Sequence, residues 1–159
     1  MQNFVTRVAM CLGVFVFVLC PAISSAQPPD PIVGAWKLNL TKSKYATPAP
    51  KSMTLTVAPA ATGYAMTVDA IGPDGKPQKW GFTSRYDGSE SPVSGNPAID
   101  AVVARSNGTS GTVQYKKAGK VVVTTTSVLS DDGKSLTATV KMLDAQGQEV
   151  TTLAVYDRQ

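Results

Sequence analysis

The stretch that decides the fold is PIVGAWKLNLTKSKY, residues 31–45, which carries Trp36, one of two tryptophans in the chain. It comes a few residues after an apolar leader, so a large aromatic side chain stands at the start of the folded part. What Trp36 packs against depends on the segments that follow and on the last residues of the chain, AVYDRQ at 154–159.

The segments after residue 45 alternate between apolar and polar residues with a period of two. Three of them are SMTLTVAP at 52–59, GYAMTVDA at 63–70 and KWGFTSRY at 79–86. In the third, Trp80, Phe82 and Tyr86 share one face, whereas Lys79 and Arg85 share the other. This alternation is typical of β-strands with one buried face, and no segment has a helical period.

Tight turns separate these strands and the strands that follow. The turn sequences are PDGK at 73–76, DG at 87–88, NG at 107–108, AG at 118–119, DDGK at 131–134 and AQGQ at 145–148. Asp-Gly and Asn-Gly provide the positive φ angles that two-residue hairpins need. The later strands, at 111–117, 120–130, 135–142 and 149–157, are each joined to the next by one such turn. The chain therefore reads as an antiparallel meander.

A meander with one apolar face has two sheet edges, and closure of the sheet removes both of them. We therefore expect an all-β protein, a single up-and-down antiparallel β-barrel of about 8–10 strands. A two-sheet sandwich is the alternative, but its crossings need longer connections than most of these turns allow. Only the connections at 41–51 and 87–100 are long, and the second has a possible short strand near Pro92 and Val93.

The chain resembles the lipocalin and calycin superfamily in Gly34-x-Trp36 on the first strand and Arg158 at the end of the last. The run GAWKLNLTKSKY, the DGKP turn and the ending AVYDRQ are more similar still to small secreted lipocalin-like proteins of bacteria. The resemblance implies that residues 27–159 form one lipocalin-like β-barrel domain. It also implies that the tryptophan closes one end of the barrel and that the arginine packs across its indole.

Strand geometry leads to the same pairing without the family. In a closed meander the last strand runs antiparallel to the first, so Arg158 lies beside Trp36. A guanidinium over an indole contributes about 0.5–2 kcal/mol. Gly34 allows another group to approach the backbone closely. We therefore interpret Gly34, Trp36 and Arg158 as the structural closed end of the barrel.

Residues 1–26 have the pattern of a secretory signal peptide. Arg7 precedes an apolar run at 8–19, and Ser24 and Ala26 occupy the positions that a signal peptidase reads. A membrane anchor is the alternative, but a spanning helix needs about 20 apolar residues. We expect cleavage after Ala26, a secreted or periplasmic protein, and no stable membrane insertion of the mature chain.

Both cysteines of the chain, Cys11 and Cys20, lie in this leader. Cys20 raises the alternative of a lipoprotein, but Leu19 is larger than the residue that usually precedes a lipidated cysteine. The mature chain would then have no thiol and no disulfide, so its core alone must stabilise the fold. Closed sheet edges predict a monomer or a weak dimer.

The charge of the chain does not indicate a nucleic-acid partner. Its formal net charge is +4, and removal of Arg7 leaves 14 basic and 11 acidic residues, a net charge of +3. The lysines are scattered, whereas nucleic-acid binders usually have a basic stripe with aromatic residues in it. We expect these lysines to be solvated surface residues.

The residue types also argue against catalysis. The chain has no histidine, and the mature part has no cysteine, which removes the usual nucleophilic sites, proton shuttles and zinc ligand sets. Many aspartates occur in turns, where they favour turn geometry: Asp74, Asp87, Asp131, Asp132 and Asp144. We predict no catalytic residues, no metal site, no cofactor and no enzymatic activity.

The remaining candidates are the apolar side chains that strand parity turns inward. They are Tyr64, Met66, Trp80, Phe82 and Tyr115. Side chains fill an eight-stranded barrel, whereas a wider one has room for a ligand. Three functions stay open on the sequence. The first is binding of a small apolar molecule in the barrel lumen, and the second is a ligand-free envelope or protein-interaction module with a filled core. An enzyme comes last, because acid–base groups are lacking.

Overall fold

The computed structural model describes residues 30–159, so the expected signal peptide and its cleavage site lie outside the described residues. Ten strands are described: β1 (Gly34–Leu38), β2 (Ser52–Pro59), β3 (Tyr64–Ile71), β4 (Pro77–Ser84), β5 (Asp87–Ser94), β6 (Ala101–Ser106), β7 (Ser110–Lys117), β8 (Lys120–Leu129), β9 (Ser135–Leu143) and β10 (Glu149–Arg158). None of these residues forms a helix of the length and hydropathy that a membrane crossing requires.

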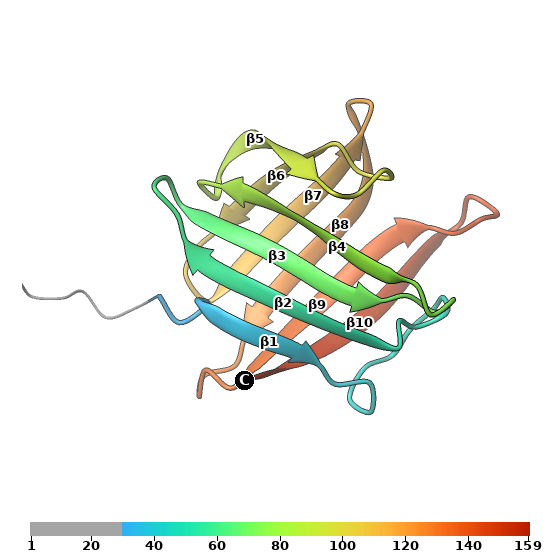
Figure 1. Ribbon diagram of the computed structural model, residues 1–159, viewed down its shortest axis with the longest axis horizontal. Coiled ribbons are helices and arrows are strands. Elements are labelled where there is room, and N and C mark those ends of the chain that lie inside the picture. Colours follow the sequence, from blue (N-terminus) through green and yellow to red (C-terminus); the bar gives the residue numbers. More distant parts are fainter. Residues whose placement is uncertain (1–29) are drawn as a thin grey trace, which may run out of the picture.

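The ten strands form one closed antiparallel barrel in which each strand pairs with its neighbours in the chain. The barrel closes where β1 pairs with β10, with Trp36 opposite Arg158 and Leu38 opposite Tyr156. Figure 1 shows the strands around a common interior and the C terminus beside β1. The expectation of an all-β, lipocalin-like up-and-down barrel is therefore confirmed.

The connection at 87–100 contains a full strand, β5, which spans Asp87–Ser94 and is longer than the short strand expected near Pro92. Its residues are mostly exposed and lack the apolar alternation of the other strands. β5 pairs with β6 at several positions but with β4 only through Gly81 with Ser94 and Phe82 with Val93. Backbone pairing with β6 therefore stabilises β5, although its side chains show no burial pattern that would predict a strand.

The barrel interior contains two groups of packed apolar side chains. The larger group surrounds Trp36 and includes Val68, Leu136 and Tyr156. The smaller group is built on β4, β6 and β7: Phe82, Val102, Ala104, Val113 and Tyr115. Both groups follow from the alternation of each strand, since every second side chain points inward.

Candidate functional site

Trp36 pairs with Arg158 where β1 meets the end of β10, and its side chain is fully buried at 0% exposure. The guanidinium carbon of Arg158 lies 4.2 Å from the centroid of the indole ring. The indole Nε1 donates a hydrogen bond to the carbonyl oxygen of Ile32 at 2.9 Å. Trp36 is therefore held by a cation on its face and an acceptor at its edge.

Arg158 also ties this end of the barrel together through backbone carbonyls. Its Nε donates to Gly133 at 2.7 Å, its Nη1 donates to Val33 at 2.9 Å, and its Nη2 donates to Pro31. Gly34 has a φ of +143°, and a Cβ there would lie 2.8 Å from Arg158 Nη1. A larger residue at this position would displace the guanidinium.

The barrel interior encloses a cavity of about 310 Å³. Every strand except β1 and β5 contributes inward side chains to its wall. The volume lies at the lower end of the range of about 300–1,000 Å³ for small-molecule sites. The barrel is therefore not filled by its own side chains.

Strand parity singled out five inward side chains, and the structure places most of them on the cavity wall. Four of them line the cavity: Tyr64, Met66, Trp80 and Tyr115. The fifth, Phe82, is buried but does not line it. The phenyl ring packs behind the wall, 6.3 Å from the ring of Tyr115.

These aromatic rings form a continuous wall that includes Tyr86. The ring of Tyr86 lies 5.9 Å from that of Tyr64 and 6.5 Å from that of Phe82. Trp80 meets Tyr115 at 5.8 Å with an interplanar angle of 82°. Edge-to-face pairs of this kind stabilise one another by about 0.5–1.5 kcal/mol beyond the area they bury. The wall therefore offers a ligand a rigid aromatic surface.

Three tyrosines that line the cavity were not among the sequence candidates: Tyr45, Tyr86 and Tyr156. Tyr86 and Tyr156 continue the alternation of Trp80 and Ala154, so parity could have identified both of them. Tyr45 lies in the long connection at 41–51, where no alternation exists. This connection folds onto β10, because Lys44 exchanges backbone hydrogen bonds with Leu153 at 2.7 and 2.8 Å.

The surface of the cavity wall is mostly apolar, and several of the polar side chains that line it already have hydrogen-bond partners. Tyr156 donates to the sulfur of Met53 at 3.3 Å, and Ser127 donates to the carbonyl of Gly111 at 3.4 Å. Thr152 accepts from the backbone nitrogen of Ala46 at 3.2 Å.

Burial raises the pKa of Tyr86 to about 12 and raises the pKa of Tyr115 further. Burial also raises the pKa of Tyr156. These phenols therefore remain neutral at physiological pH, and the cavity has no titrating acid or base.

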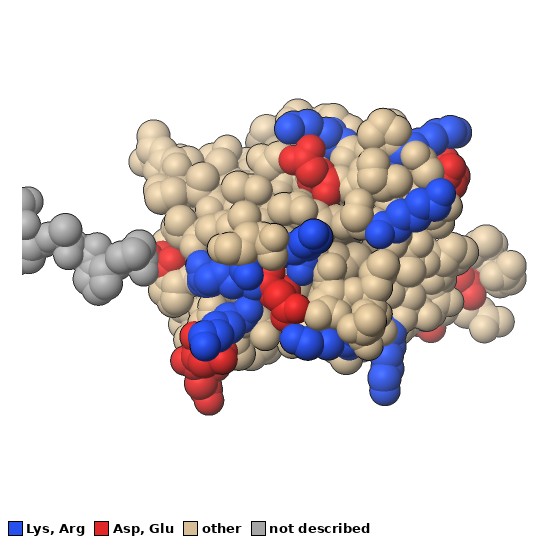
Figure 2. All heavy atoms as spheres, turned by 60° about the horizontal axis from the view of Figure 1, so that its bottom comes forward, with Lys and Arg blue, Asp and Glu red and all other residues tan. Residues whose placement is uncertain are grey.

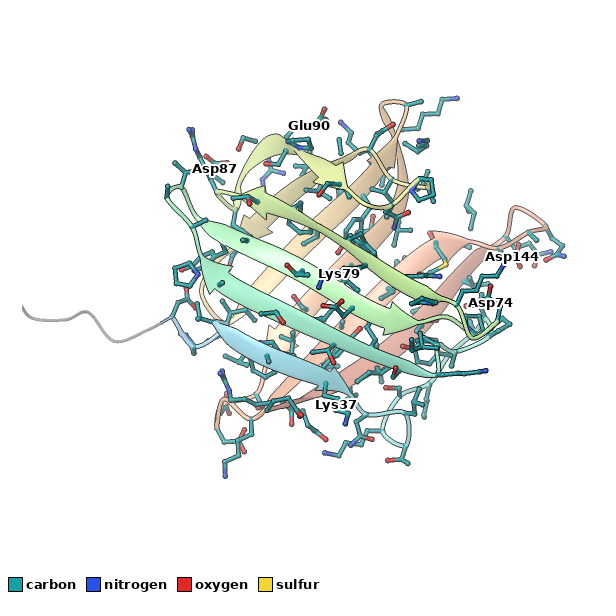
Figure 3. All side chains as sticks on the ribbon, in the orientation of Figure 1. Lys37, Asp74, Lys79, Asp87, Glu90 and Asp144 are labelled. Carbon is teal, nitrogen blue, oxygen red and sulfur yellow. The ribbon has the colours of Figure 1, made fainter. Side chains whose placement is uncertain are left out.

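No group of three or more carboxylates within residues 30–159 could hold a metal ion. Figure 3 shows Asp74 and Asp144 in turns at strand ends, and Asp87 and Glu90 on the exposed strand β5. None of these four carboxylates lines the cavity.

The fold is a closed ten-stranded antiparallel up-and-down β-barrel, and the cavity lies in its interior. One solved structure that matches is zebrafish ileal bile acid-binding protein complexed with cholic acid, at a TM-score of 0.50 and 13% identity. The match covers 81% of this chain and 99% of that one. At this identity it supports the fold. No family model and no curated protein sequence matches the chain.

Proposed function

We propose that this protein binds a small apolar molecule in the lumen of its barrel. The observation that carries the proposal is the cavity of about 310 Å³, lined by apolar and aromatic side chains of seven strands. An apolar ligand gains about 25 cal/mol for each Å² of surface removed from water. The aromatic wall is ordered by its own packing, so little further ordering opposes binding.

Two further observations support binding over the alternatives. The bile acid-binding protein that shares the fold is complexed with cholic acid, so a barrel of this architecture is compatible with a small amphipathic guest. None of the described carboxylates is buried or lines the cavity, so binding without chemical conversion fits this barrel better than catalysis does. A ligand-free module with a filled core, the alternative function, would not contain a cavity of this size.

We further propose that residues 1–26 export the chain, so that residues 27–159 bind their ligand as a secreted or periplasmic monomer or weak dimer. The resemblance to secreted lipocalin-like proteins of bacteria supports this setting. Lysines and arginines lie among acidic residues on the face in Figure 2, without forming a stripe. Lys42 pairs with Asp157 at 2.9 Å and Lys79 with Asp69 at 3.3 Å. Such a surface does not favour nucleic acid.

Titration with the neutral fluorescent probe N-phenyl-1-naphthylamine tests the proposed function. We expect saturable binding of one probe per chain at micromolar affinity, about −8 kcal/mol, with energy transfer from Trp80. Trp80→Leu should reduce the energy transfer and leave only the remainder from Trp36, which does not line the cavity. Absence of saturable binding to the folded protein would overturn the proposal.

A further inference from the structure

The cavity wall is uncharged. No lysine, arginine, aspartate or glutamate of residues 30–159 lines the cavity, and none of them is buried. Figure 3 shows Lys37 and Lys79 on strands of the barrel wall, and both residues are exposed. A ligand anion in the lumen would lose its hydration without meeting a counter-ion. Burial of an unpaired charge is among the most unfavourable events in protein chemistry.

The charged groups nearest the closed end do not change this conclusion. The guanidinium of Arg158 is engaged by three backbone carbonyls and the Trp36 ring. Asp30 accepts a hydrogen bond from the hydroxyl of Tyr64, which lines the cavity. The charged residue that contacts the cavity wall is therefore an anion, Asp30, which repels a ligand anion. The guanidinium of Arg158 is already occupied by its protein partners.

Three phenol hydroxyls on the wall have no hydrogen-bond partner within residues 30–159. One belongs to Tyr45, and the other two belong to Tyr86 and Tyr115, whose rings both contact Phe82. The hydroxyls of Tyr64 and Tyr156 differ, since each donates to an acceptor of the protein. No fully buried side-chain oxygen of residues 30–159 lacks a partner, so these hydroxyls remain accessible, and each can donate a hydrogen bond to an oxygen acceptor that a ligand supplies.

The backbone holds Tyr86 in an unusual conformation. Its φ is +58°, in the left-handed region that bulky residues rarely occupy. The Ser84 hydroxyl accepts from the Tyr86 nitrogen at 3.2 Å, and the Tyr86 carbonyl accepts from the Ser106 nitrogen at 3.2 Å. Strain of this kind tends to occur at ligand sites, where the surrounding structure maintains it.

We propose that the ligand of this cavity is an uncharged apolar molecule whose ketone, ester or alcohol oxygen accepts hydrogen bonds from Tyr86 and Tyr115. This inference rests on the proposed function, since it names the ligand class of the same cavity. This ligand class distinguishes the barrel from one that binds a carboxylate ligand in its lumen, because a carboxylate site needs a buried cation. The two phenols supply direction, and the apolar wall supplies most of the affinity.

Displacement of N-phenyl-1-naphthylamine from the wild-type protein tests the charge of the ligand. We compare 1-decanol, 2-decanone and decanoate at about pH 8 and about pH 4, on either side of the pKa of a free carboxyl group. The alcohol and the ketone should displace the probe equally at both pH values. Decanoate should be at least about tenfold weaker at the higher pH and should approach the alcohol at the lower pH.

Phenylalanine variants test the two hydroxyls. Tyr86→Phe and Tyr115→Phe keep the rings, so each should weaken 2-decanone by about threefold to tenfold and leave the hydrocarbon butylbenzene unchanged. Tyr156→Phe is the matched control, because its hydroxyl already has a partner in Met53.

Each part of this proposal has a result that overturns it. Decanoate that binds as tightly as decanol at the higher pH overturns the uncharged ligand class. Equal losses for ketone and hydrocarbon in the Tyr86→Phe and Tyr115→Phe variants overturn the role of the hydroxyls. If the neutral probe does not bind at all, the proposed function itself fails. The wild-type comparison needs no variant to fold.

Discussion

Replacement of Trp36 by alanine should destabilise the barrel more than any other single truncation at its closed end. The indole is fully buried, and large-to-small changes of an aromatic core residue cost about 3–5 kcal/mol. The variant also loses the contact with Arg158, worth about 0.5–2 kcal/mol. Because the two terms overlap, we expect a loss of about 4–6 kcal/mol.

Urea unfolding followed by far-UV circular dichroism measures this loss as a change in the midpoint of the transition. A domain of this size has a stability of about 5–15 kcal/mol, so the variant should unfold at much lower denaturant or remain partly unfolded without it. The unfolding midpoint of Trp36→Phe should fall between those of Trp36→Ala and the wild type, since the smaller ring keeps part of the buried area.

Lys37→Ala is the matched control for the same strand. Lys37 is adjacent to Trp36 but exposed, so its truncation should change the stability by no more than about 0.5 kcal/mol. A loss below about 1.5 kcal/mol for Trp36→Ala, with an unchanged slope, would refute the assignment of this residue as the closure of the barrel.

Three further predictions concern pH and the cavity. Burial raises the pKa of Tyr86 to about 12, so the neutral phenol stabilises the fold fully below about pH 10. This contribution to the free energy of unfolding should be lost as the pH rises towards 12. An absorbance titration of tyrosine ionisation measures the loss. Hydrogen bonds from Asn39 and Lys42 lower the pKa of Asp157, so its contribution should be lost as the pH falls below about 4, and Asp157→Asn should flatten that part of the acid unfolding curve. Ala138→Phe should fill the cavity and prevent binding of N-phenyl-1-naphthylamine in the folded variant, whereas Thr139→Phe, on the outer face, should bind the probe as the wild type does.

Most of the fold was accessible from the sequence because its signals are local. Period-two alternation, Gly-containing turns and the pairing of Trp36 with Arg158 at the two ends of the chain define a closed meander. β5 gave a weaker signal, since its Gly, Ser and Pro residues are exposed and its formation depends on pairing with β6. A strand that is stabilised mainly by pairing with its neighbours shows little apolar alternation in its own sequence.

The cavity could be predicted only in part. Parity turns Tyr64, Met66, Trp80 and Tyr115 inward, and they line the cavity. Parity cannot distinguish a lining side chain from one packed behind it, which is the position of Phe82. That distinction depends on the width of the barrel and on the connection at 41–51, which brings Tyr45 to the wall through contacts distant in the sequence.

The position of N-phenyl-1-naphthylamine in a crystal structure of the complex is the most direct measurement of where this protein binds a ligand. We predict one probe molecule inside the lumen, with its rings against Trp80 and Tyr115 on the aromatic wall. A probe found only on the outer surface of the barrel, with the lumen occupied by the protein's own side chains, would contradict the binding function.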